Sequence, residues 1–236
     1  MSTMAIQPLG RAVRFYEAAI GKKAVMAVTG LVLFGYVVAH MAGNLQIYFG
    51  NGQINSYAAF LHNPATAPLL WGARSFLILC VALHVVAATQ LWFQNRAARP
   101  IAYYKKVDAP TAYAARTMVW SGPIIGFFVI FHVLHLTVGS VVPLRDLNGM
   151  AITPDVRYNV IVGFQNYPLI AAFYIVAVGL LCLHLFHGVW SMFQSVGVSH
   201  PRYTEWLKRF AAIVALAIAV GDISIPVAAL AGWLHY

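Results

Sequence analysis

The chain has 236 residues, of which 61% are hydrophobic and only 9% are charged, and its formal net charge is +9. A soluble domain carries roughly 25% charged residues, so this composition excludes an ordinary soluble protein and indicates a membrane protein. The positive charge does not indicate nucleic-acid binding, because the basic residues lie between apolar runs, which is the pattern of a topology signal.

Five apolar stretches are long enough to cross a membrane as helices, which takes about 20 residues each. We therefore predict an all-α integral membrane protein, a single domain over residues 1–236 in which five transmembrane helices form a bundle. In chain order the helices are expected at about 24–45, 69–93, 117–142, 168–196 and 210–234. The preceding residues 1–23 are expected to form a cytoplasmic or interfacial segment that is able to make a short helix. No small-residue cleavage site follows this segment, so the first helix is expected to be retained.

The basic residues predict the orientation of the bundle. They gather in three segments, with four in the N-terminal segment, five between helices two and three and three between helices four and five. They are Arg11, Arg14, Lys22 and Lys23, then Arg96, Arg99, Lys105, Lys106 and Arg116, and then Arg202, Lys208 and Arg209. The first opposite loop has none, and in the second Arg145 and Arg157 lie beside Asp146 and Asp155. The positive-inside rule then places the N-terminus in the cytoplasm and the C-terminus outside.

Four histidines inside the apolar runs occur at matched depths. His40 and His132, on the first and third helices, both lie roughly 24–26 Å along their helices, towards the outer face. His84 and His184, on the second and fourth helices, match each other towards the inner face. Imidazoles in apolar surroundings are costly, so histidines at membrane depth indicate function. The alternative explanation for any single histidine is that its side chain makes a hydrogen bond to a neighbouring helix.

Two haems with two histidine ligands each would require two pairs of imidazoles, with both members of a pair at the same depth. Iron binds a neutral imidazole nitrogen, and two opposed histidines fill both axial positions, which suits electron transfer and not oxygen binding. Glycine near these histidines would let a flat macrocycle approach the backbone, although glycine is also common where membrane helices pack. The glycines are Gly35, Gly43, Gly126, Gly179 and Gly188.

Each of the third and fourth helices carries a second histidine three residues further on. His135 is expected nearly one turn further out than His132, and His187 nearly one turn further in than His184. Both would then approach the water interface, where they could donate to a haem propionate or line a quinone site. A snorkelling side chain with no specific role is the alternative for each. The sequence does not decide between two locations for the quinone pocket. One is an inner rim with Lys23, Thr29, His187 and Trp190, and the other is an outer rim with Asn44, Gln46 and His135.

Two charged residues in the apolar runs are further candidates. Arg74, near the outer end of helix two, is either a partner for a propionate of the outer haem or an interfacial anchor. Asp222, the only carboxylate within a predicted helix, could relay protons, contact a quinone or bond a neighbouring helix. A di-iron site is disfavoured, because such sites also need carboxylates and helices one to four contain none.

Several blocks of the sequence resemble a known family. They are "MAVTGLVLFGYVVAHMAGNLQIYFG", "NSYAAFLH", "IIGFFVIFHVLHL", "VRYNVIVGFQN" and "FYIVAVGLLCLHLFHGVWSMFQSVGV". They are similar to the single-subunit, five-helix cytochrome b558-type membrane anchor of succinate dehydrogenase and fumarate reductase, over nearly the whole chain from Lys22 to Leu234.

The resemblance implies which histidines hold the two haems b. It assigns His84 with His184 to the inner haem and His40 with His132 to the outer haem. Alignment on "FYIV" and "GVWS" places His184, and not His187, on the family's ligand. The implied metal ligands are thus four histidines on four helices.

The resemblance also implies partners and a location. It implies a flavoprotein subunit and an iron–sulfur subunit on the cytoplasmic face, in a respiratory complex II of the tricarboxylic acid cycle. This chain would be the electron-transfer subunit, without the catalytic head, and would exchange electrons with menaquinone or ubiquinone. It would span the bacterial cytoplasmic (inner) membrane among lipid. Cys80 and Cys182 form no cluster-binding motif, which agrees with clusters on a separate subunit. Some family members use an intramembrane glutamate in outer proton chemistry, for which Asp222 is a candidate substitute here.

Two alternatives remain at the level of sequence. The first is the cytochrome b subunit of another quinone-linked respiratory enzyme, such as a hydrogenase, formate dehydrogenase or nitrate reductase. The second is a transporter with protonatable histidines, which the odd helix count, the lack of a visible inverted repeat and the scarcity of intramembrane acids disfavour.

Overall fold

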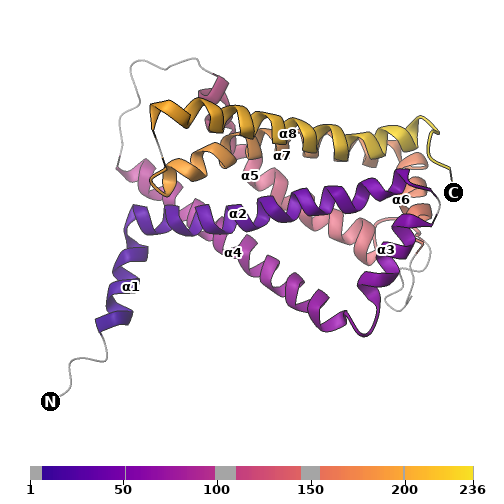
Figure 1. Cartoon of the computed structure of the whole chain (residues 1–236), viewed down its shortest axis with the longest axis horizontal. Coiled ribbons are helices and arrows are strands. Elements are labelled where there is room, and N and C mark those ends of the chain that lie inside the picture. The colour runs from indigo at the N-terminus through magenta and orange to yellow at the C-terminus, as the bar shows by residue number, and fades with distance from the viewer. Residues whose placement is uncertain (1–6, 51, 99–109, 145–154, 199, 236) are drawn as a thin grey trace.

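The computed structural model describes residues 7–50, 52–98, 110–144, 155–198 and 200–235 (Figure 1). Within these residues every regular element is helical, and five helical segments are long and apolar enough to cross a membrane. They are Ala19–Tyr48, Ala67–Ala97, Arg116–Val138, Pro168–Ser195 and Pro201–Leu230. The prediction of an all-α chain with five apolar spanning helices is confirmed for the described residues.

Shorter helices accompany these segments. In chain order the elements are α1 (Gln7–Glu17), α2 (Ala19–Asn44), η1 (Leu45–Tyr48), α3 (Gln53–His62), α4 (Ala67–Ala97), α5 (Pro110–His132), η2 (Val133–Val138), α6 (Val156–Gln165), α7 (Pro168–Ser195) and α8 (Pro201–Leu230). The element η1 is a 3-10 helix that continues α2, and η2 is a π-helix that continues α5.

Several ends of the spanning helices differ from the prediction by four or more residues, and capping features explain two of these differences. The last helix begins at Pro201, nine residues before the predicted start, because Pro201 opens the helix and the ring nitrogen Nδ1 of His200 accepts from the backbone N–H of Arg202 at 3.1 Å. Helix α8 therefore also contains Glu205, whose carboxylate accepts from Lys208 at 2.7 Å. The third segment ends at Val138 because Gly139 adopts a left-handed backbone with φ of 72°. Hydropathy marks only the apolar part of a helix and does not mark these capping features.

The bundle has two distinct ends (Figure 1). One end holds α1, the start of α2, the last turns of α4 and the first turns of α8. The opposite end holds α3, α6 and the C-terminus. Between them α2 packs against α4, α7 and α8, while α7 packs against both α5 and α8. This arrangement brings residues of four different helices next to one another inside the bundle.

The end of the bundle that holds α3 and α6 was predicted to consist of loops and is instead built from these two helices. The side-chain amide of Asn55 donates to Asp155 at 2.9 Å, and its carbonyl accepts from the backbone N–H of Arg157 at 2.9 Å. Asp155 also caps α6 by accepting from the backbone N–H of Tyr158 at 3.1 Å. These bonds tie α3 to α6 across about one hundred residues of sequence.

Two basic residues are buried, Lys22, which we counted among the topology charges, and Arg157, which we placed in the opposite loop beside Asp155. Arg157 is 7% exposed, and its guanidinium donates to the backbone carbonyls of Ile47 and, at 2.9 Å, His235. Lys22 is 5% exposed, and its ammonium donates to the carbonyls of Tyr16 and Glu17 at 3.0 and 2.7 Å. Lys22 thus satisfies the C-terminal carbonyls of α1, the short helix expected in the N-terminal segment. Arg99, Lys105, Lys106, Arg145 and Asp146 lie outside the described residues.

The bundle leaves much of its surface without a protein partner. Many large apolar side chains on the long helices are exposed, among them Leu69, Phe127 and Ile213. In a chain with five helical segments apolar enough to cross a membrane, this surface is suited to contact with lipid and with other apolar groups.

Candidate functional site

The structure brings together the histidines that the depth argument had paired. His40 of α2 and His132, the last residue of α5, have ring centroids 5.7 Å apart and planes at 89°. His84 of α4 and His184 of α7 have ring centroids 6.5 Å apart and planes at 57°. We call these the outer pair and the inner pair, after the faces on which the sequence predicts them. Because each pair joins two helices distant in sequence, it exists only in the folded bundle.

The two pairs lie at different levels along α2. His40 belongs to the outer pair, and Thr29, eleven residues earlier, contacts His84 of the inner pair. At a rise of 1.5 Å per residue, this separates the two levels by roughly 16 Å. The pairs are thus two sites and not one cluster. Consistent with this, no group of three or more His, Cys, Asp or Glu side chains in the described parts of the chain is arranged to hold a metal ion.

A hydroxyl group fixes the ring of His84. The hydroxyl oxygen of Thr29 lies 3.1 Å from Nδ1 of His84 and donates its own proton to the carbonyl of Val25 at 2.7 Å. Since that proton is used, we assign the remaining contact as donation from Nδ1–H of His84 to the oxygen of Thr29. This tautomer leaves Nε2 of His84 with a free lone pair. Gly30 lies next to the ring, since a Cβ there would be in van der Waals contact with Cε1 of His84 at 3.4 Å.

His184 is held in a similar way from a different helix. The hydroxyl oxygen of Ser121, in α5, lies 3.3 Å from Nδ1 of His184. Ser121 is only 1% exposed, so this hydroxyl is reserved for contacts inside the protein. Both rings of the inner pair therefore have a hydroxyl at Nδ1, which is the contact that orients a metal-binding histidine.

The outer pair is held by aromatic residues. The ring of Tyr36 stacks on His40, with centroids 5.4 Å apart and planes at 21°. The phenol oxygen of Tyr174 lies 3.3 Å from Nδ1 of His132. The same oxygen lies 2.9 Å from Nδ1 of His135, so the Tyr174 hydroxyl bridges His132 and His135, the two histidines three residues apart on the third spanning segment.

The second histidines do not join the pairs. His135 is fully buried and is surrounded by Phe131, Phe164 and Tyr174, so the expectation that it approaches the water interface is wrong. The physical reason is α6, which packs over the end of the third segment where a loop had been predicted. Nε2 of His135 is buried without a hydrogen-bond partner among the described residues.

His187 occupies a different environment from His135. Its ring meets the indole of Trp190 edge to face, with centroids 5.6 Å apart. Nδ1 of His187 and Nε1 of Trp190 are both buried and have no hydrogen-bond partner within the described part of the chain. The ammonium of Lys208 lies 5.6 Å above the indole of Trp190. These atoms form a half-buried polar patch on α7 and α8, one turn from His184.

The two charged candidates lie at separate places. The guanidinium of Arg74, in α4, lies 5.0 Å above the ring of Trp71 in the same helix. Asp222 is half-buried in α8.

The glycines near the histidines divide into two kinds. At Gly35, Gly126, Gly179 and Gly188, a Cβ would meet nothing within 4 Å, so the space beside the backbone is open. At Gly43 a Cβ would lie 3.0 Å from the ring of Tyr57, so this glycine is explained by the packing of α3 on α2. Of the two explanations that the sequence left open for Gly43, helix packing is therefore the one that the structure supports, because a side chain fills the space beside it.

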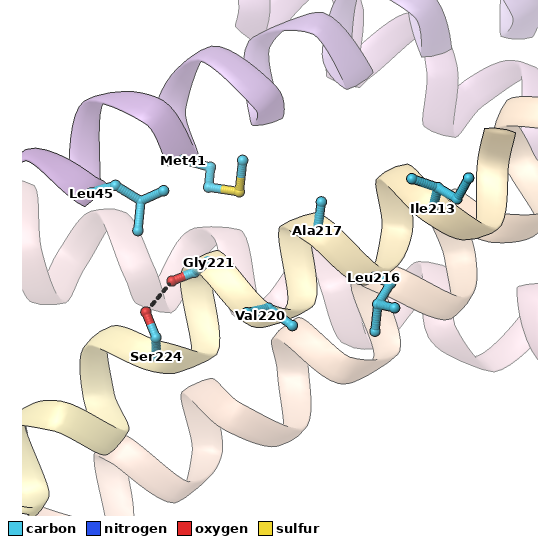
Figure 2. A pocket seen from close by; sticks show the side chains of 8 residues that line it. All are labelled: Met41, Leu45, Ile213, Leu216, Ala217, Val220, Gly221 and Ser224. Carbon is cyan, nitrogen blue, oxygen red and sulfur yellow. Dashed lines mark hydrogen bonds between the residues drawn. The ribbon is translucent and has the colours of Figure 1, made fainter.

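An apolar groove with a volume of about 650 Å³ lies between α2 and α8 (Figure 2). Met41 of α2 and Leu45 of η1 line one side, and residues of α8 from Ile213 to Ser224 line the other. The hydroxyl of Ser224 donates to the carbonyl of Gly221 at 2.7 Å. The lining contains no histidine and no charged side chain, so the groove is separate from the two pairs.

Sequence reasoning missed Tyr36, which stacks on His40, and three residues whose hydroxyl oxygens contact the paired histidines. Ser121 and Tyr174 were not considered, and Thr29 was named only as part of a polar rim. The available signal was a hydroxyl within an apolar helix. That signal is weak, because such hydroxyls often bond only to their own helix.

Comparison of the chain with protein-family models, with curated proteins and with solved structures gave no match. The chemistry of the site therefore follows from its own geometry and from the motifs of the sequence. The geometry comprises two pairs of imidazoles at two levels of a bundle whose helices are apolar enough to cross a membrane.

Proposed function

We propose that this chain is the dihaem cytochrome b membrane anchor of a succinate:quinone oxidoreductase, which passes electrons between an iron–sulfur subunit and membrane quinone. The observation that carries the proposal is the presence of two histidine pairs at two levels inside the bundle. The sequence blocks around these histidines, which resemble the anchor family, support the same function.

The spacing of the rings fits two haems. With metal–nitrogen bonds of about 2.0 Å and each nitrogen about 1.1 Å from its ring centre, two imidazoles on opposite sides of one iron have centroids roughly 6 Å apart. The measured separations of 5.7 and 6.5 Å lie on either side of this value. Rings that pack edge to face have centroids in the same range, so these separations are compatible with an iron but do not by themselves require one. A tetrahedral zinc site would need further ligands.

The protonation of the rings fits as well. Iron binds an imidazole nitrogen that carries no proton, and the contact between Thr29 and His84 leaves Nε2 in that state. Ser121 offers the same contact to His184. Open space beside Gly35, Gly126, Gly179 and Gly188 is what a flat macrocycle near the backbone would occupy.

His84 and His184 would hold the inner haem, and His40 and His132 would hold the outer haem. When bound, a haem held by two histidines would supply one-electron transfer. The chain's own contribution is to orient the rings through Thr29, Ser121 and Tyr174 and to surround them with apolar helices. Arg74 and His187 are proposed contacts for propionates or for quinone.

The proposed orientation places the α1 end of the bundle in the cytoplasm. This end includes basic residues on α1, at the end of α4 and at the start of α8, such as Arg14, Arg96 and Arg202 (Figure 1). The flavoprotein and iron–sulfur subunits would dock there, and the α3–α6 end would face the outside of a bacterial cytoplasmic membrane.

The deciding experiment is haem quantitation together with a reduced-minus-oxidised spectrum of the purified complex. We expect a b-type spectrum, two haems per chain and co-purification of a flavoprotein and an iron–sulfur subunit. Absence of a b-type signal would refute the proposal. If a chain with two haems co-purifies with a hydrogenase, formate dehydrogenase or nitrate reductase, the haem assignment is kept, but the chain belongs to that enzyme and not to a succinate:quinone oxidoreductase.

A further inference from the structure

The outer pair has a feature that the inner pair lacks, a chain of three buried side chains joined by hydrogen bonds. Tyr174 of α7 stands in the middle, with its phenol oxygen 3.3 Å from Nδ1 of His132 and 2.9 Å from Nδ1 of His135. Tyr174 is 6% exposed and His135 is 0% exposed. In contrast, the hydroxyl of Thr29 at the inner pair gives its proton to a carbonyl of its own helix. Only the outer pair thus depends on a second titratable side chain.

If His132 binds a metal, the position of each proton in the hydrogen-bonded series His132–Tyr174–His135 is determined. If Nε2 of His132 is to bind iron, its Nδ1 must carry the proton and donate to the phenol oxygen of Tyr174. Among the described residues, the remaining hydrogen-bond partner of the Tyr174 hydroxyl is then Nδ1 of His135, which accepts the phenol proton. His135 must in turn carry its proton on Nε2. The reverse order of protons would leave Nε2 of His132 protonated and unable to bind a metal.

The position of His135 is fixed by α6. A Cβ at Gly163 would lie 3.1 Å from Nε2 of His135 and 3.3 Å from its Cε1, so the ring rests against the backbone of α6. The ring of Phe164 lies next to it, with centroids 6.1 Å apart. Helix α6 is itself anchored by the bonds of Asp155 and Arg157. The ring of His135 therefore has little freedom to rotate. Through its hydrogen bond, this ring also fixes the position of the Tyr174 hydroxyl.

We propose that Tyr174 is a positioning residue for His132 and that His135 orients Tyr174, so that together they set the reduction potential of the outer haem independently of the inner haem. This inference rests on the proposed function. Donation from Nδ1–H to an oxygen makes an imidazole ligand more basic, and a more basic ligand favours the oxidised iron. Loss of the phenol oxygen should therefore raise the potential of the outer haem.

The test is a redox titration of the purified complex in which both haems are resolved. Tyr174→Phe keeps the ring that packs against Phe128 and Phe164 and removes only the hydroxyl. We expect about a tenfold change in the reduction equilibrium of the outer haem, which is about 59 mV upwards for one electron, with the inner haem unchanged. The matched control is Tyr48→Phe, which removes a hydroxyl that donates to Ser224 at 2.9 Å and not to a histidine.

A second pair of variants separates the hydrogen bond from packing. His135→Leu removes the acceptor for the phenol proton and should also shift the outer haem. His135→Asn offers a polar atom where Nδ1 stood and should restore the potential towards that of the unsubstituted complex. This pair decides the matter if Tyr174→Phe loses the outer haem altogether.

Three results would overturn the inference. They are unchanged potentials in both Tyr174→Phe and His135→Leu, a shift that falls on the inner haem, and equal shifts in His135→Leu and His135→Asn. A chain that binds no haem before any substitution would instead refute the proposed function, and the inference with it. Unchanged potentials in a two-haem complex would refute the inference alone.

Discussion

Thr29 and His84 lie 3.1 Å apart, from the hydroxyl oxygen to Nδ1, and join the first and second spanning helices inside the bundle. The two residues are 55 positions apart in sequence. Thr29 is buried and its proton is already donated to Val25, so the contact has one direction, from the imidazole to the oxygen. This single relationship sets the tautomer of one proposed haem ligand, and it can be tested without disturbing any ligand.

Thr29→Val should weaken the inner haem. Valine has the shape of threonine but offers no oxygen, so Nδ1–H of His84 would lose its acceptor. Loss of such a contact to a ligand typically costs 10–100-fold in metal affinity, and we expect a loss in this range for the inner haem. Haem titration of the purified chain measures it. Thr29→Ser, which keeps the hydroxyl, is the control, and equal affinity in both variants would contradict the prediction.

Removal of a proposed inner ligand should cost one haem. We expect His84→Ala and His184→Ala each to leave one haem b per chain, because a single remaining imidazole fills only one axial position. His187→Ala, three residues further along the same helix as His184, should retain two. Haem quantitation with the b-type spectrum distinguishes these results. Loss of a haem in His187→Ala together with its retention in His184→Ala would show that the ligand was wrongly chosen.

The same comparison applies to the outer pair. His132→Ala should lose the outer haem, whereas His135→Ala should keep both haems, because His135 lies outside the pair and is hydrogen-bonded to Tyr174, which in turn contacts His132. The spectrum and the haem content of the two variants provide the measurement. If His135→Ala loses a haem that His132→Ala keeps, the ligand of the outer site is His135.

Gly163→Ala should destabilise the outer half of the bundle. Alanine is normally favoured over glycine in a helix by roughly 0.5–1 kcal/mol, but here its Cβ would lie 3.1 Å from Nε2 of His135. Overpacking of this kind costs about 1–3 kcal/mol, which outweighs the gain. Thermal unfolding of the complex in detergent shows whether the substitution lowers or raises the stability. Gly10→Ala, at a helical glycine with nothing within 4 Å of its Cβ, serves as control and should be neutral or stabilising.

Arg157→Leu should loosen the α3–α6 end of the bundle. The substitution leaves the carbonyls of Ile47 and His235 without the guanidinium that donates to them. A buried polar group left without a partner costs about 1–3 kcal/mol, and we expect a loss of stability of at least this order. Thermal unfolding and protease sensitivity near residues 45–50 are suitable measurements. Arg202→Leu, at an exposed arginine of α8, is the control, and an equal effect in both variants would contradict the prediction.

The sequence by itself determined that the chain has five apolar helices and that four histidines lie at matched depths on four of them. Both properties are local, because hydropathy is summed along one segment and depth is counted along one helix at 1.5 Å per residue. The expectation for residues 210–234 began nine residues late for the same reason. Polar residues at the start of α8 belong to the helix through capping, and hydropathy does not register capping.

Only the tertiary structure decided what touches each histidine. The rotation of a helix about its axis and the identity of its neighbour determine whether Thr29 reaches His84 and whether Tyr174 bridges His132 and His135. The packing of α6 over η2 buried His135, although counting along one helix had placed it near water. Burial of Arg157 likewise required carbonyls from distant segments, which no local pattern encodes.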